Sequence, residues 1–397
     1  MTPTFNRTHL ADLRGATRLA VDATLGITTL VEKMHHTIQL VHPPLGGSRA
    51  KATRGLTGLV YRSIRGTTRV VGKGLDAGLG PLASLLPPGE STAARNAWVS
   101  ALNGVYGDHL ELTANPLALT MTVLRDGVTV DAAQPARVVP RATRRILVAI
   151  HGLCLNEQHW GRTGEDWLAQ VARKRGQTLL FLRYNTGRSI DSNGRSLAAL
   201  LETLVAHWPV PLEQLTLVGH SMGGLVARSA IHHGSRERHS WRSSLRQLFT
   251  LGTPHHGAPL ERGGNRLDYV LELSPYAAPF TTLARARSAG ITDLRYGSVT
   301  DAAGEFVPLP ADVECHALAA TLGKRRGILA DKLVGDGLVP LDSALGRHRL
   351  PERTLAIPAE HQWIGYEMGH LDLLGHPAVQ RQLARRLSGP RPLRRTA

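Results

Sequence analysis

The stretch Leu215-Thr216-Leu217-Val218-Gly219-His220-Ser221-Met222-Gly223-Gly224 organises this chain. Its first four residues form a short, mostly apolar run, which is typical of a buried strand. The next residues spell Gly-x-Ser-x-Gly, and from Leu225 to Ile231 the apolar spacing becomes helical. A strand that turns sharply into a helix at a serine predicts a nucleophile elbow, with Ser221 exposed above the sheet.

The glycines around the serine have a steric reason. A residue in a strained turn needs small neighbours two positions before and after it, so that the adjoining backbones can pass. Gly219 and Gly223 meet this need, and Gly224 leaves further room. The helix begins beside the serine, so its N-terminal N–H groups favour negative charge there.

Strands and helices alternate on both sides of this stretch, which predicts a parallel sheet with helices on both faces. An antiparallel hairpin over 117–130, with Asp126-Gly127 as its turn, is expected to open the sheet. The expected strands are 146–150, 178–182, 215–218, 248–251, 313–320 and 354–357. The expected helices are 166–174, 196–207, 225–232 and 377–387.

The chain before the hairpin has a different character. Residues 9–40 have helical apolar spacing, and residues 49–79 form a basic amphipathic segment with several glycines. We favour packing of this segment on the main domain over contact with a membrane surface, and both remain open. The expected domains are an N-terminal helical extension (1–100), a catalytic domain (101–388) with a lid-like insertion at 263–309, and a basic tail (389–397).

The charge balance limits the partners of this protein. Lys plus Arg number 47 against 31 for Asp plus Glu, giving a net charge of +16, which attracts anionic surfaces. Only 5% of residues are aromatic and no RNA-binding motif appears, so no nucleic acid is expected. Two cysteines make no disulfide framework, and no leader or membrane-spanning stretch is apparent. We therefore expect a cytoplasmic protein, with peripheral membrane contact left open.

A serine nucleophile needs a base, an acid that orients the base, and donors for the oxyanion. In parallel sheets such groups collect at the carboxyl ends of the strands. The strand 146–150 runs into Gly152-Leu153, where the glycine lets the next N–H turn toward the site. The N–H groups of Leu153 and Met222 are the expected oxyanion donors.

The acid and the base are sought in the later loops. Asp336 lies between two glycines in a loop and is preferred over Asp331 and Asp342. His370 follows the last expected strand and is preferred over His361. His376 precedes a proline at a helix start and fits a cap better than a base. The resulting order Ser221, Asp336, His370 is that of α/β-hydrolases.

Six motifs in this order resemble the α/β-hydrolase lipases, and within them the bacterial relatives of the GPI inositol-deacylase group. The resemblance covers roughly residues 145–387. It implies an α/β-hydrolase fold, a mostly parallel doubly wound sheet with an antiparallel start, and serine carboxylic-ester hydrolysis. It assigns the nucleophile to Ser221, the acid to Asp336, the base to His370 and the oxyanion donors to Leu153 and Met222. The motifs are His151-Gly152-Leu153, Tyr184-Asn185-Thr186-Gly187, Gly219-His220-Ser221-Met222-Gly223-Gly224, Leu251-Gly252-Thr253-Pro254-His255-His256-Gly257, Asp336-Gly337-Leu338-Val339-Pro340 and Gly369-His370-Leu371-Asp372.

The remaining candidates are weaker. In the similar lipases the segment at His255 and His256 borders the acyl site, which makes both candidate substrate-binding residues, although we favour structural hydrogen bonds over a direct part in the chemistry. Cys154 reads as a packed residue rather than a nucleophile. The histidine pairs show no convincing ligand spacing, so no metal and no cofactor are expected.

The expected function is hydrolysis of an ester or lipid substrate with an apolar acyl chain, through an acyl-enzyme. The alternatives are an acyltransferase or a polyester depolymerase with the same three residues, since both share that intermediate. A non-catalytic basic membrane adaptor is the third reading.

Overall fold

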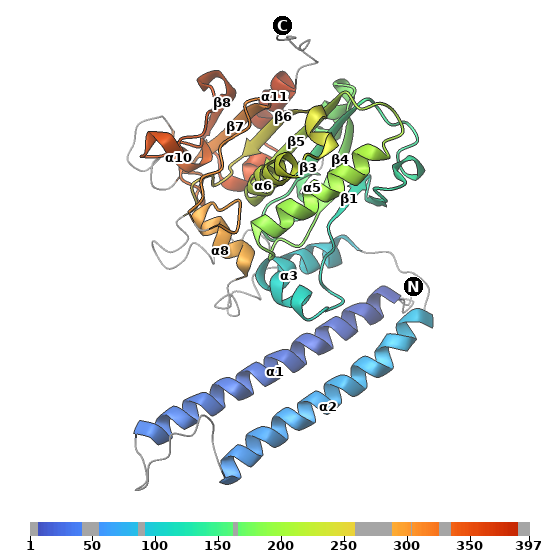
Figure 1. Ribbon diagram of the computed structural model, residues 1–397, viewed down its shortest axis with the longest axis vertical. Helices are drawn as coiled ribbons and strands as arrows, with labels where there is room; N and C mark the ends of the chain where they lie inside the picture. Colours follow the sequence, from blue (N-terminus) through green and yellow to red (C-terminus); the bar gives the residue numbers. More distant parts are fainter. Residues whose placement is uncertain are drawn as a thin grey trace. The chain divides into compact units, whose positions relative to one another are not determined.

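The computed structural model describes residues 7–41, 55–85, 92–161, 166–258, 288–302, 304–324 and 335–387. The chain divides into two compact units (Figure 1). The first comprises residues 1–92 with 112–118, and the second comprises 93–111 with 119–397. The expected domain boundary at residue 100 falls inside helix α3 (Ala93–Leu112), most of which belongs to the second unit. The expected tail, 389–397, lies outside the described residues.

An eight-stranded sheet in the order β2-β1-β4-β3-β5-β6-β7-β8 forms the centre of the second unit. Neighbouring strands from β4 to β8 are parallel, whereas β1 is antiparallel to both β2 and β4. The predicted hairpin is confirmed, with Asp126 and Gly127 at φ values of 50° and 79° in its turn. The strands are β1 (Thr122–Arg125), β2 (Val128–Val130), β3 (Arg145–Ile150), β4 (Thr178–Arg183), β5 (Gln214–His220), β6 (Leu245–Leu251), β7 (Glu314–Thr321) and β8 (Gln362–Tyr366).

One strand prediction is wrong. Residues 354–357 form a loop after a short 3-10 helix at Pro351–Arg353, and the last strand is β8. The apolar run at 354–357 is followed by Pro358, which removes a backbone donor. The edge strand β8 tolerates Gln362 and Gly365 because only one neighbour, β7, pairs with it.

Helices cover both faces of the sheet, as the alternation of strands and helices predicted. Ile146, Val148 and Ile150 of β3 pack in the core that contains residues of α5 and α6, whereas Leu147 and Ala149 pack in the core that contains residues of α4 and α11. This alternation follows from the two-residue period of a strand. Figure 1 shows α5 and α6 lying over one face. The helices are α4 (Trp167–Lys174), α5 (Ile190–Ala206), α6 (Met222–Arg236), α8 (Ala289–Tyr296), α10 (Leu341–Ala344) and α11 (Pro377–Arg386).

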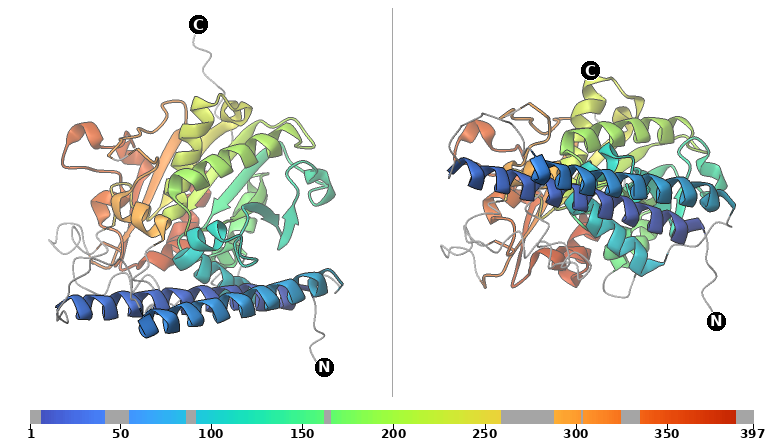
Figure 2. Two further views of the ribbon diagram at one scale, coloured as in Figure 1. Left: turned by 60° about the horizontal axis from the view of Figure 1, so that its bottom comes forward. Right: turned by 90° about the horizontal axis from the view of Figure 1, so that it is seen from below.

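The first unit is built on a helical hairpin of α1 (Arg7–Val41) and α2 (Gly55–Leu85), which lie side by side (Figures 1 and 2). Arg14 and Arg18 contact the carboxylate of Asp76, at N···O distances of 2.5 and 2.7 Å. Arg65 pairs with Glu32 near the other end of the hairpin. Early residues of one helix meet late residues of the other, so the helices are antiparallel. Among the described helices, none combines the length and apolar character needed to cross a bilayer.

Buried histidines make the stability of this fold sensitive to acid. Burial lowers the pKa of His151 to about 4 and that of His220 well below its ordinary value. An unfolded histidine has a pKa near 6.5, so below that pH the unfolded chain binds protons that these folded side chains do not.

We therefore expect the melting temperature to fall as the pH drops from about 6.5 to about 5, where most carboxylates stay ionised in both states. Calorimetry of the full chain measures this. His151→Asn should flatten the slope, whereas substitution of the exposed His207 should leave it unchanged. An unchanged slope in His151→Asn would contradict the explanation.

Candidate active site

Ser221 lies in the turn between β5 and α6, with φ 52° and ψ −123°. A positive φ is uncommon for a residue with a side chain and marks local strain. The flanking glycines are required by close backbone contacts. A Cβ on Gly219 would lie 2.4 Å from the nitrogen of Gly224, and one on Gly223 would lie 2.3 Å from the carbonyl oxygen of Ile150. Both glycines are therefore required by the turn, as expected from the sequence.

His370 is joined to Asp336 by a short hydrogen bond, 2.7 Å between Nδ1 and Oδ2. The backbone supports this pair, because the N–H of His370 donates to the carbonyl oxygen of Asp336. Both side chains are buried, the aspartate completely. Because an ionised carboxylate only accepts hydrogen bonds, Nδ1 carries the proton and Nε2 is left as an acceptor.

The second carboxylate oxygen of Asp336 also accepts hydrogen bonds. Oδ1 accepts hydrogen bonds from the N–H groups of Leu338 and Val339, at 3.0 and 2.8 Å. Space beside the pair depends on Gly252, whose φ is 59°. A Cβ there would lie 3.1 Å from Cε1 of His370 and 3.2 Å from Oδ2 of Asp336. The motif following β6 therefore leaves room for the acid and the histidine.

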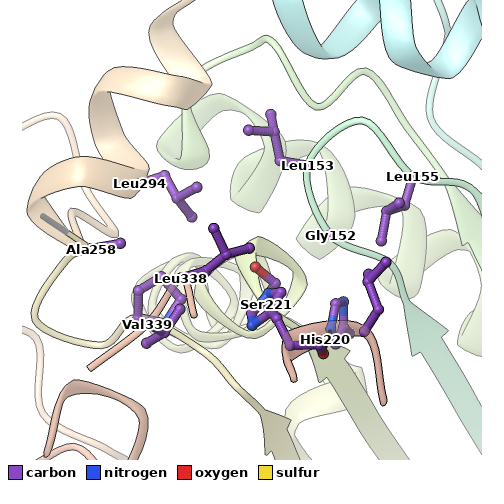
Figure 3. A pocket seen from close by; sticks show the side chains of 12 residues that line it. Gly152, Leu153, Leu155, His220, Ser221, Ala258, Leu294, Leu338 and Val339 are labelled. Carbon is purple, nitrogen blue, oxygen red and sulfur yellow. Dashed lines mark hydrogen bonds between the residues drawn. The ribbon is translucent and has the colours of Figure 1, made fainter. Parts of the chain in front are cut away.

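Ser221 and His370 line the same cavity. Figure 3 shows Leu153, Leu294 and Leu338 around the serine. Most other lining groups are apolar, so the cavity offers a hydrophobic surface beside the serine hydroxyl. The remaining lining residues are Gly152, Leu155, His220, Pro254, Ala258, Val339 and Leu371.

One predicted oxyanion donor, Leu153, is among the lining residues of this cavity. The other, Met222, directly follows Ser221 as the first residue of α6. N–H groups in the first turn of a helix have no acceptor within the helix. A Cβ on Gly152 would lie 3.0 Å from Cβ of Ser221, so glycine at 152 allows this loop to approach the serine closely.

The rival acids and bases that the structure describes lie apart from the serine cavity. Asp342 is in the first turn of α10, and Asp331 lies outside the described residues. His376 caps α11 by accepting a hydrogen bond from the N–H of Ala378. The Nε2 atom of His361 lies 3.6 Å from Oε1 of Glu314, at the beginning of β7. Among the candidate acids and bases that the structure describes, Asp336 and His370 alone form a pair beside the serine cavity.

His255 and His256 are absent from the lining of the serine cavity, although Pro254 of the same turn lines it. The Nδ1 atom of His255 lies 3.2 Å from Nη1 of Arg228, and its Nε2 lies 3.2 Å from Oγ1 of Thr250. His256 Nε2 contacts the carbonyl oxygen of Gly346. Both histidines therefore make structural hydrogen bonds, and their part in substrate binding stays a prediction.

Cys154 is buried, and burial raises the pKa of its thiol to about 12. A thiol that stays protonated at neutral pH is a poor nucleophile. Its environment matches that of a packed core residue.

The apolar wall of the cavity was missed by sequence reasoning. Leu294 comes from α8, within the expected insertion 263–309, and nothing in its local sequence marks it as a lining residue. Residues 259–287, which contain the first part of that insertion, lie outside the described residues. Leu338 and Val339 could have been found, since they directly follow Asp336 in its motif.

Comparisons with known proteins agree with the motif-based resemblance. Residues 143–309 match the family model described as PGAP1-like alpha/beta domain, a segment that contains Ser221 but neither Asp336 nor His370. No curated protein matches the chain.

Solved structures similar to this chain include the mature form of Bacillus licheniformis lipase BlEst2, with 21% identity, coverage of 68% of this chain and 98% of that chain, and a TM-score of 0.42. A Pyrococcus furiosus esterase, PF2001, has 14% identity, coverage of 62% and 80%, and a TM-score of 0.39. Residues 143–309, which contain Ser221 and the parallel strands β3 to β6, are thus similar to the PGAP1-like alpha/beta domain.

Proposed function

We propose that this protein is a serine carboxylic-ester hydrolase in which Ser221 is the nucleophile, His370 the general base and Asp336 the orienting acid. The observation that carries the proposal is the 2.7 Å Asp336–His370 pair, whose histidine lines the same cavity as the strained Ser221. A serine, a histidine and a buried carboxylate in this relation are the parts that acyl transfer needs.

In this mechanism His370 Nε2 takes the proton from the Ser221 hydroxyl as the oxygen attacks the ester carbonyl. Asp336 holds the ring in the tautomer that leaves Nε2 available and stabilises the imidazolium that forms. Protonated His370 then gives the proton to the leaving alcohol, which leaves an acyl-enzyme on Ser221. Water, activated by the same histidine, hydrolyses this intermediate and restores the serine.

The N–H groups of Leu153 and Met222 are proposed to bind the oxyanion. Each such donor typically lowers the barrier by about 3 kcal/mol. The apolar lining from Leu153, Leu294 and Leu338 supports a substrate with an apolar acyl chain. A transferase or a polyester depolymerase would use the same groups. Product analysis with and without added alcohol separates hydrolysis from transfer to that acceptor.

Ser221→Ala should lower kcat by about 10⁴-fold or more, because it removes the group that forms the acyl-enzyme. The assay is hydrolysis of p-nitrophenyl esters of increasing chain length. The melting temperature should stay the same, which separates lost chemistry from lost folding. Undiminished turnover, or labelling by a fluorophosphonate at another residue, would refute the assignment.

Asp336→Asn and His370→Ala should each inactivate the enzyme. The asparagine amide can donate to Nδ1 and favour the wrong tautomer, a change that costs about 10⁴-fold in serine proteases. Asp342→Asn, Asp331→Asn and His361→Ala are the matched controls and should lose little activity. An inactive His361→Ala variant beside an active His370→Ala variant would show that the base is the other histidine.

We further propose that the helical hairpin makes weak peripheral contact with anionic membranes, through the basic segment 49–79. Its helices carry apolar side chains with exposed fractions from 41% at Ile64 to 72% at Val70. Arg62, Arg69 and Lys73 are also exposed on α2. Near an anionic surface each cation adds about 1 kcal/mol of attraction. The exposed apolar residues are Leu13, Ile27, Leu30, Val31, Leu59, Val60, Ile64, Val70, Val71 and Leu75.

The full chain should therefore float with vesicles that contain acidic phospholipid at low salt, and less with neutral vesicles or at high salt. Replacing Val70 and Val71 by aspartate should abolish flotation. The control is Val128→Asp, which changes a valine that is 54% exposed on β2 and should float normally. Equal flotation of all three proteins would exclude the hairpin as the lipid-binding element.

A further inference from the structure

Two histidines and a glutamate come together at the edge of the sheet, far along the chain from the serine motif. Glu314 and His316 lie two residues apart on β7, so their side chains project from the same face. His361 ends a short 3-10 helix immediately before β8, the strand that pairs with β7. Their ligand atoms all lie within 4.8 Å of one another.

The distances fit one shared cation. Glu314 Oε1 lies 3.2 Å from His316 Nε2 and 3.6 Å from His361 Nε2. Two ligands of a tetrahedral zinc ion, each at about 2.05 Å from the metal, are separated by about 3.4 Å. One carboxylate oxygen thus stands at the required distance from two imidazole nitrogens.

His316 has no other polar partner to explain its position. Its side chain is 2% exposed, and within the described part of the chain neither ring nitrogen makes a hydrogen bond. The ring stacks on Phe249 of β6, its partner in the strand register, with centroids 4.5 Å apart. Packing therefore holds the imidazole with Nε2 only 3.2 Å from Glu314 Oε1. A buried polar group without a hydrogen bond is costly, and a metal ion would offset that cost.

The second carboxylate oxygen of Glu314 accepts a hydrogen bond from a neighbouring strand. Gln247 Nε2 donates to Glu314 Oε2 at 3.1 Å, and the same amide contacts the carbonyl oxygen of Arg386. The oxygen of that amide accepts from Gln214 at 3.3 Å. Partners of this kind fix the direction in which a ligating carboxylate points, and they are a regular feature of metal sites.

We propose that Glu314, His316 and His361 form a site for a divalent transition metal, with zinc the best fit and water as the fourth ligand. Two imidazoles and one carboxylate are a donor set that zinc accepts. The guanidinium of Arg386 donates to the carbonyl oxygen of Glu360, and its positive charge disfavours a cation at this site. The negative charge of Glu314 offsets this repulsion.

The site is separate from the proposed ester chemistry. Glu314 begins β7, whereas Ser221 follows the carboxyl end of the parallel strand β5. Opposite ends of parallel strands lie at opposite edges of a sheet. A bound metal would link the beginning of β7 to the beginning of β8, and binding to the folded state alone would raise stability.

The test uses the full chain, stripped with a chelator, dialysed and titrated with Zn²⁺. Binding is measured by competition with a chromophoric chelator and by metal content after gel filtration. The wild type should retain one zinc per chain and melt at a higher temperature with zinc than without. Glu314→Gln and His361→Ala should each weaken binding by more than about 100-fold, since loss of outer partners alone costs about 10–100-fold.

The matched control is His239→Ala. His239 Nε2 lies 3.1 Å from Glu237 Oε2, a histidine–glutamate pair of nearly the same spacing as His316 and Glu314. This variant should keep its zinc, as should Ser221→Ala, which tests the ester chemistry separately. Wild-type protein that retains no more zinc than His361→Ala would overturn the proposal, whether or not esters are hydrolysed. Zinc retention equal to that of the wild type in both His361→Ala and Glu314→Gln would place the metal elsewhere and overturn it as well.

Discussion

The close passage of backbone at the turn from β5 to α6 is the constraint on which the rest of the structure depends. The first turn of α6 packs so tightly against β3 and β5 that side chains at Gly219 and Gly223 would overlap main-chain atoms. This contact forces Ser221 into a positive φ and raises its side chain above the sheet. Strain of this kind persists only where the surrounding structure holds it. The seven residues of β5, all buried, provide that support.

A second constraint on the structure is the burial of the Asp336 carboxylate. Asp336 is completely buried, and burial of an unpaired carboxylate is strongly unfavourable. Three hydrogen bonds offset this cost, two from the backbone of its own loop and one from His370. The same bonds fix the carboxylate in position, so the groups that stabilise the buried acid also orient the histidine. Gly252, directly after β6, packs against this pair. A larger residue there would press against the side chains of His370 and Asp336.

The two edges of the sheet have different chemical character. The carboxyl ends of the strands hold the serine, the histidine and an apolar cavity, whereas the beginning of β7 holds the histidine–glutamate cluster. Both clusters use a carboxylate that other groups hold in place, a loop backbone for Asp336 and a glutamine for Glu314. The helical hairpin differs from both. Ion pairs join its two helices, while many of its apolar side chains remain exposed.

By itself, the sequence determined the elements whose signals are local. The two-residue and helical periods, the Asp-Gly turn and the glycines around Ser221 each follow from steric rules within a few residues. The helices, the elbow and all the predicted strands but the last are present. The sequence also singled out Asp336 and His370, which the structure joins, although their catalytic role stays a prediction. It misplaced the last strand, whose position in the sheet is set by pairing with β7. Only the tertiary structure brought Leu294 to the cavity and His361 to His316 and Glu314, because contacts between distant segments leave no periodic trace in the chain.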